Sequence, residues 1–267
     1  MRPRPIAFSL LVTSAAFAQL GAPYRPASAP ERTFTFGVQS YGPSFTGHFN
    51  GTQDGQPIAL DLEGDLGLGK DKTTPGLFFD YQGPRFAFQV SSGSAEYRGD
   101  RVVTRTVTVD GVDYAAGTRV QSHVKLASVD GIWTIKFLRR PDAWLGLDLG
   151  VQAWTLDLDA AGTPPLPLTP VASSTTIKAP IPQIGLSGGS RGFNGAVESK
   201  AYFHYLGAKG AKYTMLGADL RVFPVRWFGL RVFYEGSTFD VPRGSVKDDL
   251  EFRLDRKGVG FGGVVRF

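Results

Sequence analysis

The 267-residue chain contains no cysteine, which excludes disulfides, thiol chemistry and lipid attachment through an N-terminal cysteine. It has only three histidines, so candidates for acid–base catalysis are few. After the N-terminal segment there is no run of 18 apolar residues, and no transmembrane helix is predicted. Basic residues are scattered. Without Arg2 and Arg4 the formal charge falls from +5 to +3, too small an excess to predict nucleic-acid binding.

The first residues have the pattern of a secretory signal. Arg2 and Arg4 precede an apolar stretch from Ile6 to Phe17, and Ala16-Phe17-Ala18 is a small-x-small cleavage site. The stretch is shorter than the roughly 20 residues of a transmembrane helix. A buried N-terminal helix is the alternative. We predict a signal peptide over residues 1–18, a flexible Ala- and Pro-rich leader over 19–31 and one domain over 32–267.

What the chain does contain is period-two alternation, with 42% apolar residues, 12% aromatic residues and 34 glycines. For example, Leu145, Leu147 and Leu149 alternate with small or polar residues. The pattern predicts an all-β fold of ten strands, which cover residues 32–49, 75–82, 85–97, 119–138, 143–158, 176–189, 193–206, 213–223, 227–239 and 250–267.

Connection lengths alternate along the chain. Tight turns are expected at 82–84, 139–142, 189–192 and 224–226, where Pro or Gly supplies the backbone geometry. Longer polar connections lie at 51–74, 98–118, 160–175, 207–212 and 240–249. Transmembrane barrels have this asymmetry, with short periplasmic turns and long external loops. A soluble β-sandwich or lipocalin-like barrel is the alternative, and it would not require such alternation.

The last strand carries apolar or small residues at every second position up to an aromatic end: Val259, Phe261, Gly263, Val265 and Phe267. In this respect the chain resembles the outer-membrane β-barrel proteins of Gram-negative bacteria. The resemblance implies a transmembrane antiparallel up-and-down barrel in the outer membrane. It also implies that this strand is the signal read by the barrel assembly machinery, and that the barrel contacts outer-membrane lipids and lipopolysaccharide. We expect a monomer.

If the apolar positions face lipid, the opposite positions fill the lumen. They include a balanced set of charges that we predict to form an interlocking network, because an unpaired charge in a narrow dry lumen is costly. The set is Asp80, Arg85, Asp130, Lys136, Asp148, Glu198, Lys200, Asp219, Arg221, Arg231, Glu235 and Arg266. A ten-stranded barrel is close to the size that side chains fill, so we expect a plugged lumen. A narrow pore for small solutes is the alternative.

The histidines do not match known catalytic patterns. Outer-membrane phospholipases and lipid A deacylases carry His-x-Ser, whereas His48, His123 and His204 are followed two positions later by Asn50, Lys125 and Leu206. Omptin-type proteases use an Asp-x-His pair, and no Asp stands two residues before a His. We predict no catalytic residues, cofactor or metal, and a structural or surface-interaction role. A lipid-modifying enzyme with an unrecognised site is the further alternative.

Three external features remain. Asp61, Glu63 and Asp65 could bind Ca²⁺ or form a short strand with an acidic face, and the spacing favours the strand. Residues 102–111 predict a two-stranded hairpin with an Asp-Gly turn, and the prolines near 164–170 predict a stiff loop.

In the fourth and tenth predicted strands the apolar residues change from even to odd positions, between Leu126 and Trp133 and between Leu254 and Val259. Either β-bulges or extensions beyond the membrane would explain it.

Overall fold

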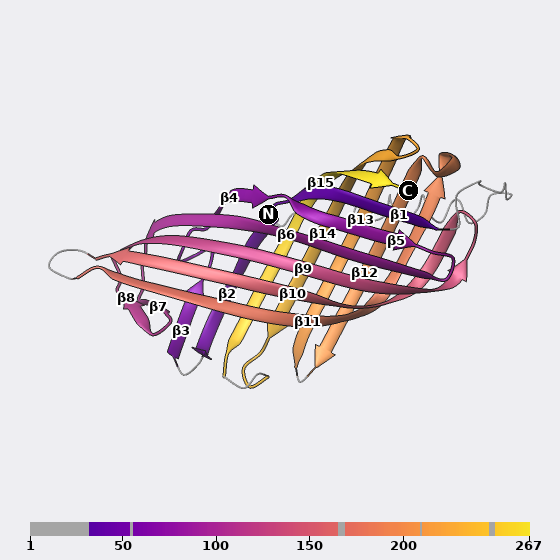
Figure 1. Cartoon of the computed structure of the whole chain (residues 1–267). Helices are drawn as coiled ribbons and strands as arrows, with labels where there is room; N and C mark the ends of the chain where they lie inside the picture. The colour runs from indigo at the N-terminus through magenta and orange to yellow at the C-terminus, as the bar shows by residue number, and fades with distance from the viewer. Residues whose placement is uncertain (1–31, 54–55, 165–168, 209, 246–248) are drawn as a thin grey trace, which may run out of the picture.

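The computed structural model describes residues 32–53, 56–164, 169–208, 210–245 and 249–267. The predicted signal peptide and leader lie outside these residues, as do Pro165 and Pro167 of the proline-rich loop. Figure 1 shows a tilted barrel in which the long strands β9, β10 and β11 lie side by side and project beyond the other strands at one end. Within the described part of the chain, no helix is long and apolar enough to cross a membrane.

The structure contains fifteen strands in one sheet. They are β1 (Thr33–Tyr41), β2 (Ser44–Gln53), β3 (Gln56–Asp61), β4 (Gly69–Thr74), β5 (Gly76–Gln82), β6 (Phe86–Val102), β7 (Val107–Val109), β8 (Val112–Tyr114), β9 (Arg119–Arg139), β10 (Ala143–Thr163), β11 (Val171–Gly192), β12 (Val197–Ala208), β13 (Ala211–Val225), β14 (Phe228–Val241) and β15 (Glu251–Arg266).

A ring of ten antiparallel strands closes the barrel. Its order is β1, β5, β6, β9, β10, β11, β12, β13, β14 and β15, and β15 pairs with β1 to complete it. The backbones of Phe34 and Phe267 exchange two hydrogen bonds of 3.0 and 2.9 Å at this seam. Closure removes the free sheet edges, whose backbone N–H and C=O groups would find no hydrogen-bond partners in lipid. The predicted ten-stranded transmembrane barrel is confirmed.

The predicted strand bounds differ from the structure mainly at two places. The turn expected at 189–192 lies instead at Phe193–Gly195, and β11 continues to Gly192. Phe193, Asn194 and Gly195 all have positive φ, so Asn-Gly was the turn signal. Gly189 serves packing, because a Cβ there would lie 2.8 Å from the Trp144 ring.

The second difference is a break in the predicted first strand at Gly42 and Pro43, which separates β1 from β2. Both strands pair with β15, but β1 pairs on its other edge with β5, whereas β2 pairs with β3. The wall therefore divides above Pro43. One part continues through β4, β6, β9, β10 and β11, and the other continues through β15, β2, β3, β7 and β8.

Strand β10 shows how the barrel is divided along its axis. Even-numbered residues face inward along its whole length, but the polarity of the two faces inverts near Trp154. Below this point the outer face is apolar, from Leu145 to Val151, and the inner face carries Asp148 and Gln152. Above it the inner face is apolar and the outer face carries polar groups. Apolar residues face outward only where lipid surrounds the wall, so the inversion marks the membrane boundary.

The same inversion explains the changes of apolar parity in β9 and β15. Leu126 faces inward and Trp133 outward without any register shift between them, and the same holds for Leu254 and Val259. The bulge interpretation of these two strands is therefore wrong. The extension interpretation is supported, because these strands pass from lipid into water while the side-chain alternation continues unbroken.

Above the membrane boundary the two parts of the wall enclose an apolar cluster, which we call the upper core. The hairpin of β7 and β8 turns at Asp110-Gly111, as predicted, but it does not stand free. It pairs with β3 and places Tyr114 against β10, where its hydroxyl donates to the Ala160 carbonyl at 3.0 Å. Burial raises the pKa of Tyr114. The upper core includes Phe45, Phe49, Leu60, Leu62, Leu66, Tyr97, Val107, Val109, Val124, Leu126, Trp154, Leu156, Leu158, Phe252 and Leu254.

We predict that charge is tolerated on the outer face only above the boundary. Leu149→Arg, in the middle of the lipid-facing part of β10, should lower the free energy of unfolding by about 2–4 kcal/mol. Ala161→Arg, on the outer face of the same strand above the boundary, should change it by less than about 0.5 kcal/mol. Urea unfolding in lipid vesicles measures both. Equal losses would place the boundary elsewhere.

Candidate functional site: the filled lumen

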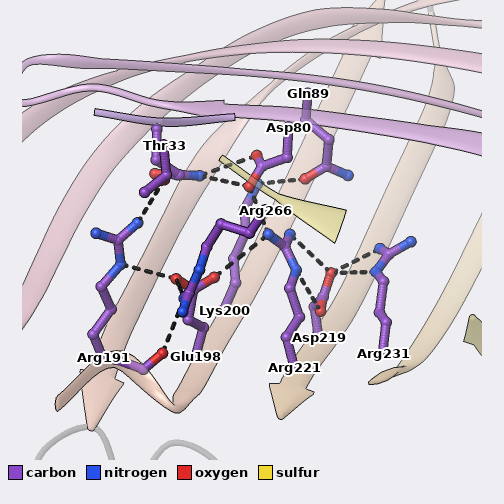
Figure 2. Close-up of polar contacts among 12 residues, drawn as sticks. Thr33, Asp80, Gln89, Arg191, Glu198, Lys200, Asp219, Arg221, Arg231 and Arg266 are labelled. Carbon is purple, nitrogen blue, oxygen red and sulfur yellow. Dashed lines mark hydrogen bonds and ion pairs between the residues drawn. The ribbon is translucent and has the colours of Figure 1, made fainter. Parts of the chain in front are cut away.

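The membrane-spanning half of the barrel contains several groups of paired charged and polar side chains, which together we call the lumen network; Figure 2 shows part of it. At its centre Arg221 lies between two carboxylates, with Nη1 2.6 Å from Asp80 and Nε 3.3 Å from Asp219. Asp219 also binds Arg231 at 2.7 Å. All four are almost fully buried, and the ring of Phe78 lies beneath both guanidinium groups. Two acids and two bases thus compensate each other away from water.

Glu198 is the centre of a second group near the periplasmic end. Its Oε1 lies 3.1 Å from Nε of Arg191 and 3.0 Å from Nη1 of Arg266, and its Oε2 lies 3.7 Å from Arg221. The guanidinium of Arg266 also covers the ring of Phe223 at 3.7 Å. Arg221 therefore connects this group to the first one, as Figure 2 shows.

Asp148 on β10 is held by three neighbours. Thr134 and Ser187 donate to its Oδ1 at 2.6 and 2.7 Å, and Nε2 of His204 lies 3.0 Å from its Oδ2. The ring of His204 stacks on Tyr202, and the residue is only 2% exposed. The two hydroxyls contact the carboxylate rather than the imidazole, so this group is not arranged as a nucleophile next to a base.

The highest part of the network lies directly below the upper core. Arg256 forms an ion pair with Glu235, and Tyr202 donates to the same carboxylate at 3.2 Å. Arg256 also lies over the rings of Tyr41 and Trp154 at 5.5 and 5.0 Å. These contacts join the charged layer to the apolar one, to which Trp154 belongs.

The two predicted lysines bind neutral oxygens. Lys200 donates to Gln89 at 3.0 Å, and Lys136 donates to the Gln82 side chain and the Gly83 carbonyl at 2.8 and 2.9 Å. Lys136 also lies 4.8 Å from the centre of the Trp144 ring. A cavity of about 30 Å³ near this end is lined by residues such as Trp144 and Arg191. That volume holds about one water molecule.

Of the twelve predicted lumen residues, two lie outside the network. Arg85 is exposed in the turn between β5 and β6. Asp130 faces inward, but its Oδ1 has no hydrogen-bond partner among the described residues. The other ten are Asp80, Lys136, Asp148, Glu198, Lys200, Asp219, Arg221, Arg231, Glu235 and Arg266.

Three basic members of the network were absent from the predicted set. Arg191 was assigned to a turn, although it lies within β11. Arg256 shares the inward parity of Leu254, and that shared parity was the available signal. His204 has the same inward parity as Tyr202, but its partner Asp148 lies 56 positions away, so no local pattern joins them.

The other two histidines lie outside the lumen. His48 is exposed on the outer face of β2. His123 lies on the outer face of β9, with Nε2 3.5 Å from Glu96 and Nδ1 3.7 Å from Asp159. It lines a surface cleft of about 1020 Å³ together with Asp159 and Ser174. Ser174 donates to Asp159 at 2.7 Å, so the seryl hydroxyl is not directed at the imidazole.

The acidic stretch forms a turn, and the prediction of a short strand with an acidic face is wrong beyond Asp61, where β3 ends. Asp61 Oδ1 accepts hydrogen bonds from the backbone of Glu63 and Gly64, and Asp65 Oδ2 accepts one from the backbone of Asp61. Asp65 also pairs with Arg105 of the β6–β7 connection. These carboxylates serve to hold the loop beside the upper core. In the described part of the chain, no group of three His, Cys, Asp or Glu residues could hold a metal ion.

The predicted assembly signal lies on the outer face of β15. Val259, Phe261 and Phe267 are 61, 65 and 73% exposed, and the Phe267 ring lies 6.3 Å from that of Phe36. Gly263 and Val265 share this face and are less exposed. The residues are placed where lipid, or a protein that inserts the barrel, would contact them.

Comparison with solved structures agrees with this architecture. The outer-membrane protease OmpT of Escherichia coli superimposes with a TM-score of 0.57 at 10% identity, over 92% of this chain and 99% of OmpT. The chain has the outer-membrane β-barrel fold. Ail of Yersinia pestis and OprG of Pseudomonas aeruginosa also match, at 14% and 12% identity. Each has a TM-score of 0.33, with coverage of 89% and 88% of this chain and 100% and 95% of theirs. No protein-family model and no curated protein matches the barrel.

We predict that the lumen network is essential to stability. Asp219→Ala should cost about 3–5 kcal/mol, because it leaves the guanidinium groups of Arg221 and Arg231 buried with less compensating charge. Asp100→Ala is the control. Its side chain accepts two 2.7 Å hydrogen bonds from Arg119, which hold its pKa below the usual range, but the pair is exposed to water. Its removal should leave the unfolding midpoint unchanged. A similar loss for both would show that buried pairing is not the cause.

Proposed function

We propose that this protein is a non-conducting, non-catalytic outer-membrane barrel that acts through its extracellular surface. The observation that carries the proposal is the presence of two successive fillings in one ring. The lumen network occupies the membrane half, and the upper core occupies the half above it. A barrel built to pass solutes would need a continuous water-filled path along its axis. Side chains of the lumen network and of the upper core each occupy part of that path.

The upper core supports the proposal most directly. Leu62, Leu66 and Val124 have no exposed surface, and the β7–β8 hairpin lies over the open end. A hydrated ion crossing this region would lose its water without gaining polar partners, which is strongly unfavourable. The lumen network adds a second obstacle, because its charges are already engaged with one another.

The positions of the histidines support a non-catalytic role. His204 is buried on Asp148, so a substrate could not reach its ring without rearrangement of the lumen. Both ring nitrogens of His123 face carboxylates, which leaves neither directed at a hydroxyl nucleophile. The fold is compatible with a monomer inserted by the assembly machinery and surrounded by outer-membrane lipid and lipopolysaccharide.

The residues that project above the membrane are the surface left for function. Strands β9, β10 and β11 have 21, 21 and 22 residues. A transmembrane strand needs only about 9–11. Their outer faces above the boundary carry Lys125, Asp157 and Asp159, among others, and are suited to contact with polar surroundings. The projecting sheet therefore supports an interaction role.

Planar-bilayer recordings test the absence of conduction. The refolded protein should insert without discrete current steps, because both fillings remain in place. A variant in which residues 104–117 are replaced by a short Gly-Ser linker loses the hairpin and should also stay silent, since the lumen network is intact. A porin reconstituted in the same membranes confirms detection. Discrete openings of the unmodified protein would contradict the proposal.

Lipid analysis tests the absence of catalysis. Mass spectrometry of lipid A and phospholipids, from cells with and without the protein, should show the same acyl composition. His123→Ala and His204→Ala should leave that composition unchanged as well. A change in acylation that depends on the protein and disappears in either variant would establish an enzyme.

A further inference from the structure

One edge of β11 is unpaired where the strand rises above the membrane. β11 pairs with β10 from Val171 to Ser190, but it pairs with β12 only from Ile184 to Gly192. The hairpin of β12 and β13 turns back between Ala208 and Ala211, too early to cover the rest. Among the described residues, no strand pairs with the second edge of β11 over residues 171–183.

Two prolines show which backbone groups point to this edge. Pro180 and Pro182 lie opposite Ala153 and Val151 in a ladder with β10 that has no register shift. Proline has no N–H to donate to a neighbouring strand. The backbone nitrogen and carbonyl of each proline must therefore point away from β10, toward the other edge of β11. Residues of the same parity face the same way. The N–H and C=O groups of Ala172, Ser174, Thr176 and Lys178 are therefore directed at the open edge.

The open edge lacks the usual protection against pairing. Exposed edge strands are commonly blocked by charged residues, prolines or bulges. Residues 171–177 (Val-Ala-Ser-Ser-Thr-Thr-Ile) contain none of these, and threonine, valine and isoleucine favour strands. The prolines block only the part next to the membrane. By contrast β4, which pairs with one partner only, has charged residues at Lys70, Asp71 and Lys72.

Side chains around the edge also favour an added strand. Ser174 and Thr176 donate to Asp159 and Asp157 of β10 at 2.7 and 2.8 Å, so their hydroxyls are held away from the edge. On the inner side Ile177 and Phe239 are half-buried against the upper core and line the same small apolar cavity. An added strand with apolar side chains at alternate positions would cover them.

We propose that the edge from Ala172 to Ile177 binds an extended segment of another protein by β-strand addition. The proposal rests on the surface-interaction role above and gives its partner a chemical class: an uncharged polypeptide segment, apolar at every second residue on one face. Backbone N–H and C=O groups at the spacing of a strand are what complement this edge, and alternate side chains would supply specificity.

Barrel tilt disfavours a second copy as the occupant. Strands in transmembrane barrels tilt by roughly 35–45° from the axis. Two copies in one membrane, related by rotation about its normal, would present β11 with the same sense of tilt. Their edges would cross at roughly 70–90°, which is far from the nearly parallel alignment that a ladder requires.

The test uses the purified full-length barrel in detergent and a fluorescent nine-residue peptide of alternating threonine and valine, capped at both ends. Fluorescence anisotropy should show saturable binding. The double variant Ser174→Pro, Thr176→Pro removes two N–H donors from the edge, as Pro180 and Pro182 already do, and should bind at least about tenfold more weakly. The matched control, Ser174→Val with Thr176→Val, loses the same hydroxyls but keeps the N–H groups and should bind like the unmodified protein.

A second arm does not depend on folding of the proline variant. The same peptide with two adjacent central residues N-methylated loses a donor on each of its edges and should not bind the unmodified barrel. Equal binding of both peptides, or of the proline and valine variants, would overturn the proposal, as would no binding at all. Self-association that is lost only in the proline variant would show that a second copy occupies the edge. Conductance recorded on the same preparation tests the non-conducting role separately.

Discussion

The structure depends on one constraint: a strand directs alternate side chains to opposite faces along its whole length, whatever solvent surrounds it. Each long strand of this barrel crosses from lipid into water, so the face that must be apolar changes from outside to inside at the boundary. In β10 the outward series ends near Val151 and the inward series begins at Trp154. The backbone ladder continues without interruption, and only the chemistry of the side chains changes.

This inversion gives the barrel two interiors with different physical character. In the membrane half the interior must accept the polar positions, and buried charges are stable there only when they compensate one another. Arg221 achieves this by contacting Asp80, Asp219 and Glu198, which come from three different strands. Above the boundary the interior resembles that of a soluble sandwich, in which β7 and β8 close the open end over the upper core. Glu235 and Arg256 lie where the two interiors meet.

Closure of the ring gives every strand in lipid a hydrogen-bonded neighbour on both edges. The strands that project into water do not need a neighbour on both edges. In water an unpaired edge can bind solvent, so β11 can extend beyond β12 at little cost. Pro180 and Pro182 mark the place where pairing with a neighbour ends. Beyond them, in the described part of β11, the architecture leaves strand-forming, uncharged backbone available to a partner over residues 171–177. The lumen and the lipid-facing wall offer no comparable surface.

The sequence by itself determined the number of strands in the ring, the alternation of short and long connections, and the parity of strands such as β10, because these follow from local periodicity and turn residues. It also identified ten members of the lumen network, since inward parity is a local property. The tertiary structure decided which charges meet: His204 with Asp148, and Arg191 with Glu198. It also decided that Oδ1 of Asp130 has no hydrogen-bond partner among the described residues and that the turn falls at Asn194. Contacts between strands depend on ring closure and stagger, and no local pattern encodes the distance between residues on separate strands.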